Sequence, residues 1–223
     1  MTQQTQRVAN ILFVTQVLGL IMVGTSQFVR MFDSVEGVSM SMHLCFMAFL
    51  TFMAMIALNA HRAHATRATI QILAIYLVGF GAIGPCTALL AKHLLTGFYI
   101  WTRSDTITML CAAVGSVLIV GTLGKRYSIH DPIVRGLLAT CSKALPQLLM
   151  AWKMWRDGGE GYAAVAIWTA HITTLIRLGQ VILSRERGGK WTRSHMGLFI
   201  GEGTNELSWT LVTIAWLFGG SHI

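Results

Sequence analysis

The most informative residues for chemistry lie in an apolar segment near the end of the chain, residues 196–219. Five polar or aromatic residues in this segment are spaced i, i+3, i+4, i+7 and i+11, so a helix would place them on one face. They are Glu202, Asn205, Glu206, Trp209 and Thr213. Carboxylates inside an apolar helix are costly and normally face a partner or a watery cavity.

This row predicts one wall of a polar binding site. The amide of Asn205 would donate and accept hydrogen bonds, the ring of Trp209 would stack on a bound group, and a glutamate would carry a proton. Two alternatives stay open from the sequence. The polar residues could instead lock two helices together, or Glu202 could lie close enough to the surface to be solvated.

A second polar row lies in the segment 132–155, where Thr140, Lys143 and Gln147 share a face. Lys143 is near the middle of its segment, too far from either end for its ammonium group to reach water. A buried ammonium group needs an anion, and Glu202 or Glu206 is the natural candidate. Such a pair would sense protonation or bind a charged substrate; the alternative is a static ion pair between helices.

The elements that must position these residues are membrane-spanning helices. Of the 223 residues 54% are hydrophobic and 12% are charged, with a mean hydropathy of +0.60, whereas a soluble domain carries about 25% charged residues. Most of the exterior must therefore face a lipid bilayer, in which each long apolar run is helical. Apolar windows of spanning length predict seven segments: 8–30, 38–60, 69–91, 106–124, 132–155, 162–184 and 196–219.

The basic residues punctuate these runs, as loops of membrane proteins do, so the net charge of +8 does not indicate a nucleic-acid partner. The alternate loops that include the N-terminus hold ten lysines and arginines, and the opposite loops hold five. The larger set is Arg7, Arg62, Arg67, Lys125, Arg126, Arg135, Arg185, Arg187, Lys190 and Arg193, and the smaller is Arg30, Lys92, Arg103, Lys153 and Arg156. This excess predicts a cytoplasmic N-terminus.

The chain also contains an internal repeat. Short matches between the two halves occur in order at the similar offsets of 120, 124 and 122 residues. The matched positions are Gln27 with Gln147, Glu36-Gly37 with Glu160-Gly161, and Gly79-Phe80-Gly81 with Gly201-Glu202-Gly203. A single helix between two three-helix units lets the units lie parallel in the membrane. Transporters place substrate sites at the interface between such repeats.

Pro146-Gln147 after a polar helix, followed by a short loop with Gly161, resembles the PQ-loop superfamily, which includes the SWEET sugar facilitators, lysosomal amino-acid exporters and the KDEL receptor. The resemblance implies an all-α integral membrane fold with two parallel three-helix bundles, residues 1–95 and 131–223, joined by a linker with the fourth helix, 96–130. The first copy departs from the family, with Ser26 before Gln27 where a proline is usual. The N-terminus of SWEET-type members also lies outside, opposite to the orientation that the charges predict.

The resemblance further implies roles for single residues. Pro146 would act as a rocking point, since proline permits a kink; the alternative is a fixed bend. Pro85 would break the third segment in the same way, which follows from proline itself and not from the resemblance. Gln27 and Gln147 would anchor a loop backbone or face the pathway. Asn205 is in a place comparable to the asparagine that lines the sugar pocket of SWEET-like proteins, but its counterpart by offset is Ile83, so the pocket would be asymmetric.

Three other residues in the apolar segments receive plainer interpretations. Arg177 lies about seven residues from a helix end, from which its side chain would reach the surface. His43 and His171 do not align under the repeat and are expected to be hydrogen-bonded core residues rather than ligands.

We therefore expect a multi-pass protein of the cell (inner) membrane that transports a small polar solute, such as a sugar, an amino acid or a vitamin-like compound, by alternating access, with or without proton coupling. The alternative is a membrane receptor or sorting protein of the same fold that binds a ligand without net transport. Catalytic motifs of intramembrane enzymes are absent from the sequence, and neither a cofactor nor a metal is expected. Whether the chain forms a homo-oligomer is left open.

Overall fold

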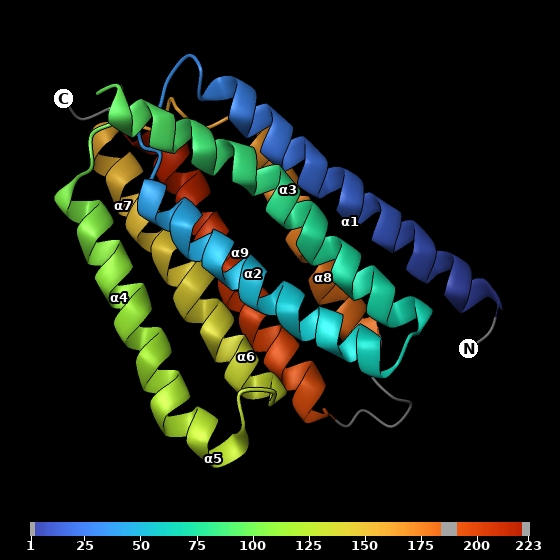
Figure 1. The fold of residues 1–223 in the computed structure, drawn as a ribbon. Helices are drawn as coiled ribbons and strands as arrows, with labels where there is room; N and C mark the ends of the chain where they lie inside the picture. The colour runs from blue at the N-terminus through green and yellow to red at the C-terminus, as the bar shows by residue number, and fades with distance from the viewer. Residues whose placement is uncertain (1–2, 184–190, 220–223) are drawn as a thin grey trace.

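The computed structural model describes residues 3–183 and 191–219, and this part of the chain folds into helices joined by short loops (Figure 1). The first three long helices are α1 (Gln3–Arg30), α2 (Met40–Ala63) and α3 (Arg67–Leu95). The fourth segment runs through α4 (Arg103–Ile119), the π-helical turn η1 (Val120–Gly124) and α5 (Lys125–Tyr127). The fifth runs through α6 (Pro132–Ala139), the π-helical turn η2 (Thr140–Ala144) and α7 (Leu145–Asp157). The last two are α8 (Ala164–Leu183) and α9 (Arg193–Phe218).

These seven helical segments coincide with the seven apolar windows to within a few residues. Five of the described helices are long and apolar enough to cross a membrane: α1, α2, α3, the α4–α5 segment and α8. The fifth segment is divided by η2, and α9 carries Glu202, Asn205 and Glu206 in its middle. The two segments that are less suited to lipid are thus the ones that hold the predicted polar rows.

Local sequence explains where the helices begin. Ser39, Thr66, Thr102 and Thr192 are N-caps whose side chains accept hydrogen bonds from the first turns of α2, α3, α4 and α9. Asp131 caps α6 in the same way, just before Pro132. These caps satisfy backbone amide groups that have no partner within the helix.

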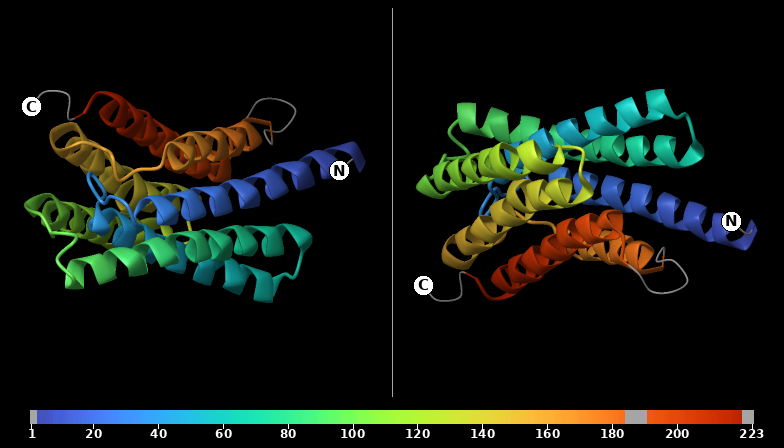
Figure 2. Two further views of the ribbon diagram at one scale, coloured as in Figure 1. Left: turned by 90° about the horizontal axis from the view of Figure 1, so that it is seen from above. Right: turned by 90° about the horizontal axis from the view of Figure 1, so that it is seen from below.

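The helices pack as two groups of three. In the first group α3 contacts both α1 and α2, and in the second α9 contacts α8 and the α6–α7 segment. Between the groups, α1 packs against α8, and α2 packs against η2 and α7. Viewed from above, α1 has α3 on one side and α8 on the other (Figure 2). The fourth segment lies outside, with α4 against α2 and α7.

Glycines allow the closest helix contacts. A Cβ atom at Gly197 of α9 would collide with the carbonyl of Pro132, and one at Gly136 of α6 would collide with the backbone of Gly197. Small residues at such crossings are typical of helices that associate in membranes. The contact fixes α6 against α9 at the end of the molecule where both helices begin.

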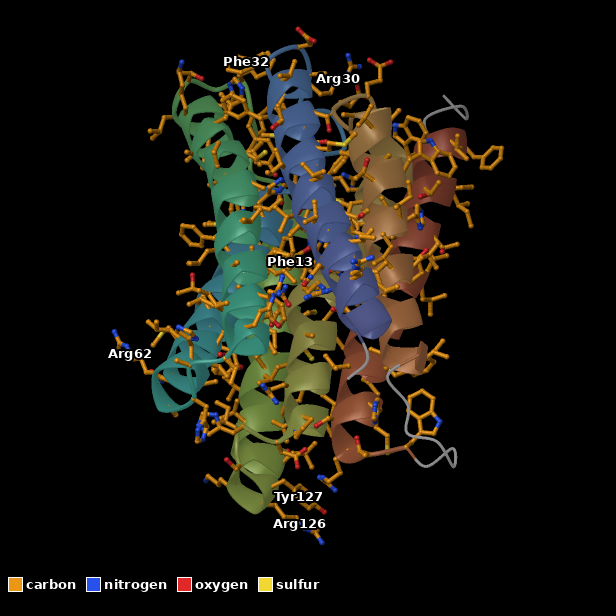
Figure 3. The ribbon with its side chains drawn as sticks, turned by 90° about the vertical axis from the view of Figure 1, so that its right-hand side faces the viewer. Phe13, Arg30, Phe32, Arg62, Arg126 and Tyr127 are labelled. Carbon is orange, nitrogen blue, oxygen red and sulfur yellow. The ribbon has the colours of Figure 1, made fainter. Side chains whose placement is uncertain are left out.

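The side chains of Arg30 and Phe32 lie at one end of the molecule, and those of Arg62, Arg126 and Tyr127 lie at the other (Figure 3). The two predicted sets of basic loops are therefore at opposite ends of the helices. Arg185, Arg187 and Lys190 of the larger set lie outside the described residues.

Candidate functional site

A cavity of about 110 Å³ lies between the two groups of helices. Side chains from α1, α2, α3, η2, α7, α8 and α9 line it. Six of the seven residues predicted to bind a solute are among them: Gln27, Lys143, Gln147, Glu202, Asn205 and Trp209. Residues from distant parts of the sequence are thus brought to one place, because α9 and the α6–α7 segment face the first group of helices across this cavity.

Glu202 lies between two cations in the cavity wall. One carboxylate oxygen accepts a hydrogen bond from Nη1 of Arg177 at 2.7 Å, and the other lies 3.7 Å from Nζ of Lys143. The predicted pairing of Lys143 with Glu202 is therefore present, and Glu202 is 9% exposed and not solvated. Two neighbouring cations stabilise the ionised carboxylate strongly at this low exposure.

The expectation that Arg177 reaches the surface is wrong. Its side chain turns into the cavity, where its guanidinium group binds Glu202. The physical reason is that a buried carboxylate attracts the guanidinium group more strongly than the distant interface does. Tyr76 of α3, which the sequence did not single out, also interacts with Arg177 and lines the cavity.

Lys143 has an unusual environment for an ammonium group. It is 7% exposed, and its Nζ lies 5.7 Å from the ring centre of Phe46 and 5.6 Å from that of Phe49, both on α2. Aromatic faces attract a cation weakly compared with a full ion pair. With Glu202 Oε2 at 3.7 Å, beyond hydrogen-bond distance, the ammonium group donates no hydrogen bond to the described residues, and the Lys143 side chain lines the cavity.

The amides in the cavity wall are held differently. Gln147 accepts a short hydrogen bond from the hydroxyl of Ser208, and Asn205 donates one to Oγ1 of Thr174 at 3.0 Å. The Oδ1 atom of Asn205 is buried without a hydrogen-bond partner among the described residues. A buried acceptor without a partner is energetically costly, so a hydrogen-bond donor on a bound solute would be favourable at this atom.

Glu206 is the one predicted binding residue that does not line the cavity. Its Oε1 lies 2.5 Å from Nδ1 of His171 on α8, and Nε2 of that ring lies 2.7 Å from Oγ1 of Thr213. The physical reason is that consecutive residues of a helix point about 100° apart, so Asn205 faces the cavity while Glu206 turns toward α8. His171 is hydrogen-bonded, as expected, but its partner is a carboxylate that sequence spacing alone could not identify.

His43 also combines two features. Its Nδ1 lies 2.9 Å from the carbonyl oxygen of Ser39, as expected of a hydrogen-bonded core histidine, and its ring borders the cavity.

Gln27 joins the two groups at one end of the cavity. Its amide donates to the carbonyl of Gly161 at 2.8 Å and accepts from the backbone of Ala163 at 3.2 Å. It therefore both anchors a loop backbone and lines the cavity, whereas Gln147 bonds a side chain of α9. The two glutamines matched by the repeat are not equivalent in their contacts.

The loops that carry the repeated Glu-Gly pairs touch each other at this end. The amide of Gly161 donates to the carbonyl of Glu36 at 2.9 Å, and a Cβ atom at Gly37 would collide with the carbonyl of Gly158. Gly37 has a φ of 73°, a conformation that favours glycine. Arg30 adds a hydrogen bond of 2.6 Å to the carbonyl of Glu160.

A buried acidic network closes the same end. Asp105, in the first turn of α4, is fully buried and accepts hydrogen bonds from Tyr99, Ser39 and Ser41 at 2.8–3.0 Å. Lys153 of α7 lies 3.5 Å from this carboxylate and donates to the carbonyl of Val38 at 2.8 Å. Lys153 was predicted to lie in a basic loop, but it is 6% exposed and connects the second group of helices to the beginning of α2.

The opposite end is hollow. A second cavity of about 480 Å³ adjoins the first, and both are lined by Phe49, Tyr76, Arg177 and Glu202. It extends along the end of α2 and the beginnings of α3, α6 and α9, where Ala60, Pro132 and Ser194 line it. The central cavity thus continues toward the end of the molecule that carries Arg62 and Arg126 (Figure 3).

Comparisons of the chain with protein-family models, curated proteins and solved structures give no match. The chemistry of the site must therefore be inferred from its own residues. Within residues 3–183 and 191–219, no group of three or more histidine, cysteine, aspartate or glutamate side chains is placed to hold a metal ion.

The predicted hinge positions lie in different backbone environments. Pro146 is buried and lies just after η2. At the end of η2 the backbone amide of Leu145 donates to the carbonyl of Thr140, whereas in an α-helix it would donate to that of Cys141. Pro85 lies inside α3, which continues through it. Thr140 does not share the cavity face with Lys143; its hydroxyl lies 3.0 Å from that of Thr204 on α9.

Proposed function

We propose that this protein is a membrane transporter that moves a small polar solute by alternating access. The observation that supports this most directly is the central cavity, which lies between two groups of helices and carries buried polar groups. It shares Phe49, Tyr76, Arg177 and Glu202 with a second cavity toward one end, whereas the hollow at the other end shares only Tyr162 with it. At the other end the loops and the Asp105–Lys153 network join the two groups. A site with one open side and one closed side is what alternating access requires in each of its states.

The arrangement of helices supports two equivalent units, residues 1–95 and 131–223, as in the PQ-loop and SWEET-like proteins. The first helix of one unit, α1, packs against α8, the second helix of the other. The reciprocal contact exists between α2 and the α6–α7 segment. A two-fold axis along the membrane normal produces this reciprocity, and the fourth segment outside it serves as the linker that makes the units parallel.

The chain would lie in the cell membrane with its N-terminus in the cytoplasm, because most of the basic loop residues lie at that end. In this orientation the described conformation is open toward the cytoplasm. The buried pair of His171 and Glu206, beside the cavity but not in it, is the best candidate for proton coupling.

The test is solute uptake by proteoliposomes that contain the purified protein. A panel of radiolabelled sugars, amino acids, organic acids and nucleoside vitamins would be compared with empty liposomes at two external pH values. We expect time-dependent uptake of at least one solute, reduced about tenfold or more by Asn205→Ala, which removes a cavity hydrogen-bonding group. Lys125→Met, at an exposed position outside both cavities, is the matched control.

Binding of a solute or a peptide without any uptake would contradict transport and would favour a receptor of the same fold. Uptake that is equal in the wild type and Asn205→Ala would contradict the assignment of the cavity as the transport site.

A further inference from the structure

We infer that the transported solute is a small organic acid, with one carboxylate group and a hydroxyl group close to it. This inference rests on the proposed function and adds the chemical class of the solute. It is carried by the balance of charge around the two cavities and by two buried atoms, Asn205 Oδ1 and Arg135 Nε, that have no hydrogen-bond partner among the described residues.

The ionisable residues that line the cavities are predominantly cationic. Among the described lining residues, the cations are Lys143, Arg177 and Arg135, and the one acidic side chain is Glu202. His43 also lines the central cavity, with its Nδ1 directed to a backbone carbonyl. Charge away from water is stable only when it is compensated, so the cavities favour a solute that brings a negative charge.

The position of this charge follows from the pairs already made. Arg177 and Glu202 satisfy each other at 2.7 Å, whereas Lys143 is left with the more distant oxygen at 3.7 Å and with two aromatic faces. A carboxylate in the central cavity would give the ammonium group of Lys143 the close hydrogen-bonded anion that it lacks. Phe46 and Phe49 would then border the bound group without competing for its charge.

The second recognised group follows from Asn205. Its buried Oδ1 is an acceptor without a partner among the described residues, so it calls for a donor on the solute. A hydroxyl group provides one without cancelling the negative charge of the carboxylate, and a hydrocarbon does not. Leu20, Val23 and Ile83 make the rest of the wall apolar, and about 110 Å³ of space admits only a few non-hydrogen atoms without rearrangement.

The second cavity, through which a solute would reach the site, is also lined by a cation. Arg135 lines the second cavity, and its Nε atom is buried without a hydrogen-bond partner within the described part of the chain. A cleft lined by one sign of charge raises the local concentration of the opposite ion. An anion would therefore be attracted from the open end past Arg135 toward Lys143.

The experiment compares each acid with its neutral amide, so that size and shape stay nearly constant. Binding of lactate and lactamide, and of glycerate and glyceramide, is measured by tryptophan fluorescence and thermal stabilisation of the detergent-purified wild type at constant ionic strength. We expect the acids to bind at least about tenfold more tightly than the amides, because a hydrogen bond to a charged group contributes more than a neutral one.

Variants then test the site. Lys143→Met is expected to weaken binding of the acids about tenfold to a hundredfold and binding of the amides by a smaller factor, because a neutral amide carbonyl makes a weaker hydrogen bond to an ammonium group than a carboxylate does. Lys143→Arg keeps the charge and should retain the preference, and Lys125→Met is the control for a lost surface charge. If Lys143→Met does not fold, the wild-type comparison and Lys143→Arg still decide the question.

Equal binding of acids and amides, or unchanged preference in Lys143→Met, would overturn the inference. Uptake of a neutral sugar that is sensitive to Asn205→Ala, with no binding of acids, would overturn it and leave the proposed transport function in place. Absence of binding and of uptake for every solute class would overturn both.

Discussion

At the residue scale, two glutamates four positions apart on α9 have different ion-pair partners. Glu202 accepts from Arg177 and lies close to Lys143, so it is held as a carboxylate. Glu206 faces only His171, and its second oxygen is buried without a partner in the described chain. The other ring nitrogen of His171 lies 2.7 Å from the hydroxyl of Thr213, which also donates to the carbonyl of Trp209. The side chains of His171 and Glu206 are thus held against each other between α8 and α9.

This short contact predicts strong energetic coupling between the two residues. His171→Leu and Glu206→Leu should each reduce stability by about 1–2 kcal/mol, because each leaves a polar partner unpaired in a region of low polarity. The double variant should cost less than the sum of the two single variants. The measurement is a double-mutant cycle of thermal unfolding in detergent micelles, with Ile172→Ala at a neighbouring exposed position of α8 as the control. Additive effects would show that the residues do not interact.

Five of the six cavity residues were predicted because they stand in polar rows inside apolar segments, and Gln27 was predicted from the repeat and the family resemblance. The sequence could not show that Asn205 lines the cavity and Glu206 does not. Both residues lie on one broad face of the helix, and only the packing of the helices decides which of the two side chains faces the cavity. The sequence also missed Arg177, Tyr76 and Arg135 as cavity residues. Arginine near a helix end and tyrosine within one are common at membrane interfaces. The inward direction of Arg177 depends on the position of Glu202, which is known only once the helices are assembled.

At the element scale, the fifth segment differs most from expectation. Pro146 predicts an irregular helix because its nitrogen has no hydrogen to donate, but the irregularity takes the form of a π-helical turn over Thr140–Ala144. Such turns insert an extra residue into a helix and are frequent at functional sites. The insertion changes the direction of the side chains along the segment, which explains why Thr140 meets Thr204 while Lys143 and Gln147 line the cavity.

The contact between α6 and α9 gives a prediction about helix packing. Gly197→Ala places a methyl group against the backbone of Pro132 and Ile133, where no flexible side chain is available to move. It should therefore lower stability by about 1–3 kcal/mol. Gly203→Ala on the same helix is the matched control, because no atom lies within 4 Å of its added methyl group and alanine favours helix by up to about 1 kcal/mol.

Thermal unfolding of both variants in detergent is the measurement. A stability loss in Gly203→Ala as large as that in Gly197→Ala would contradict the close contact. It would indicate instead that glycine is needed for another reason throughout α9.

At the scale of the whole molecule, hydropathy predicts the seven helical segments, because each long apolar run must satisfy its backbone groups internally. It does not predict which helices touch, since lipid-facing and helix-facing apolar side chains look alike in sequence. The repeat suggested the positions that would correspond between the two halves. It did not predict that the Glu36-Gly37 and Glu160-Gly161 loops meet each other, or that Asp105 and Lys153 form a buried network beside them.

These contacts lead to a prediction about motion of the whole molecule. If the two three-helix units rock about the cavity, the closed end must open when the hollow end closes, because each unit is held rigid by its own helix contacts. Spin labels at Thr96 and Glu160 report the distance across the closed end, and labels at Ala65 and Ser194 report the distance across the hollow end. The labels are placed in a background without the four native cysteines. In liposomes, a bound solute should shift the two distance distributions in opposite directions.

Breaking the closed end should produce the same shift without a solute. Gln27→Ala removes both hydrogen bonds to the loop that begins α8, and Arg30→Ala removes the one to Glu160. Together these losses should lengthen the Thr96–Glu160 distance and shorten the Ala65–Ser194 distance in part of the population. Each hydrogen bond contributes about 1 kcal/mol, and a change of 1.4 kcal/mol alters a two-state equilibrium tenfold, so the minor state should become measurable by double electron–electron resonance. A change at the closed end alone would mean local fraying of the loops, and the two units would then not move as rigid bodies.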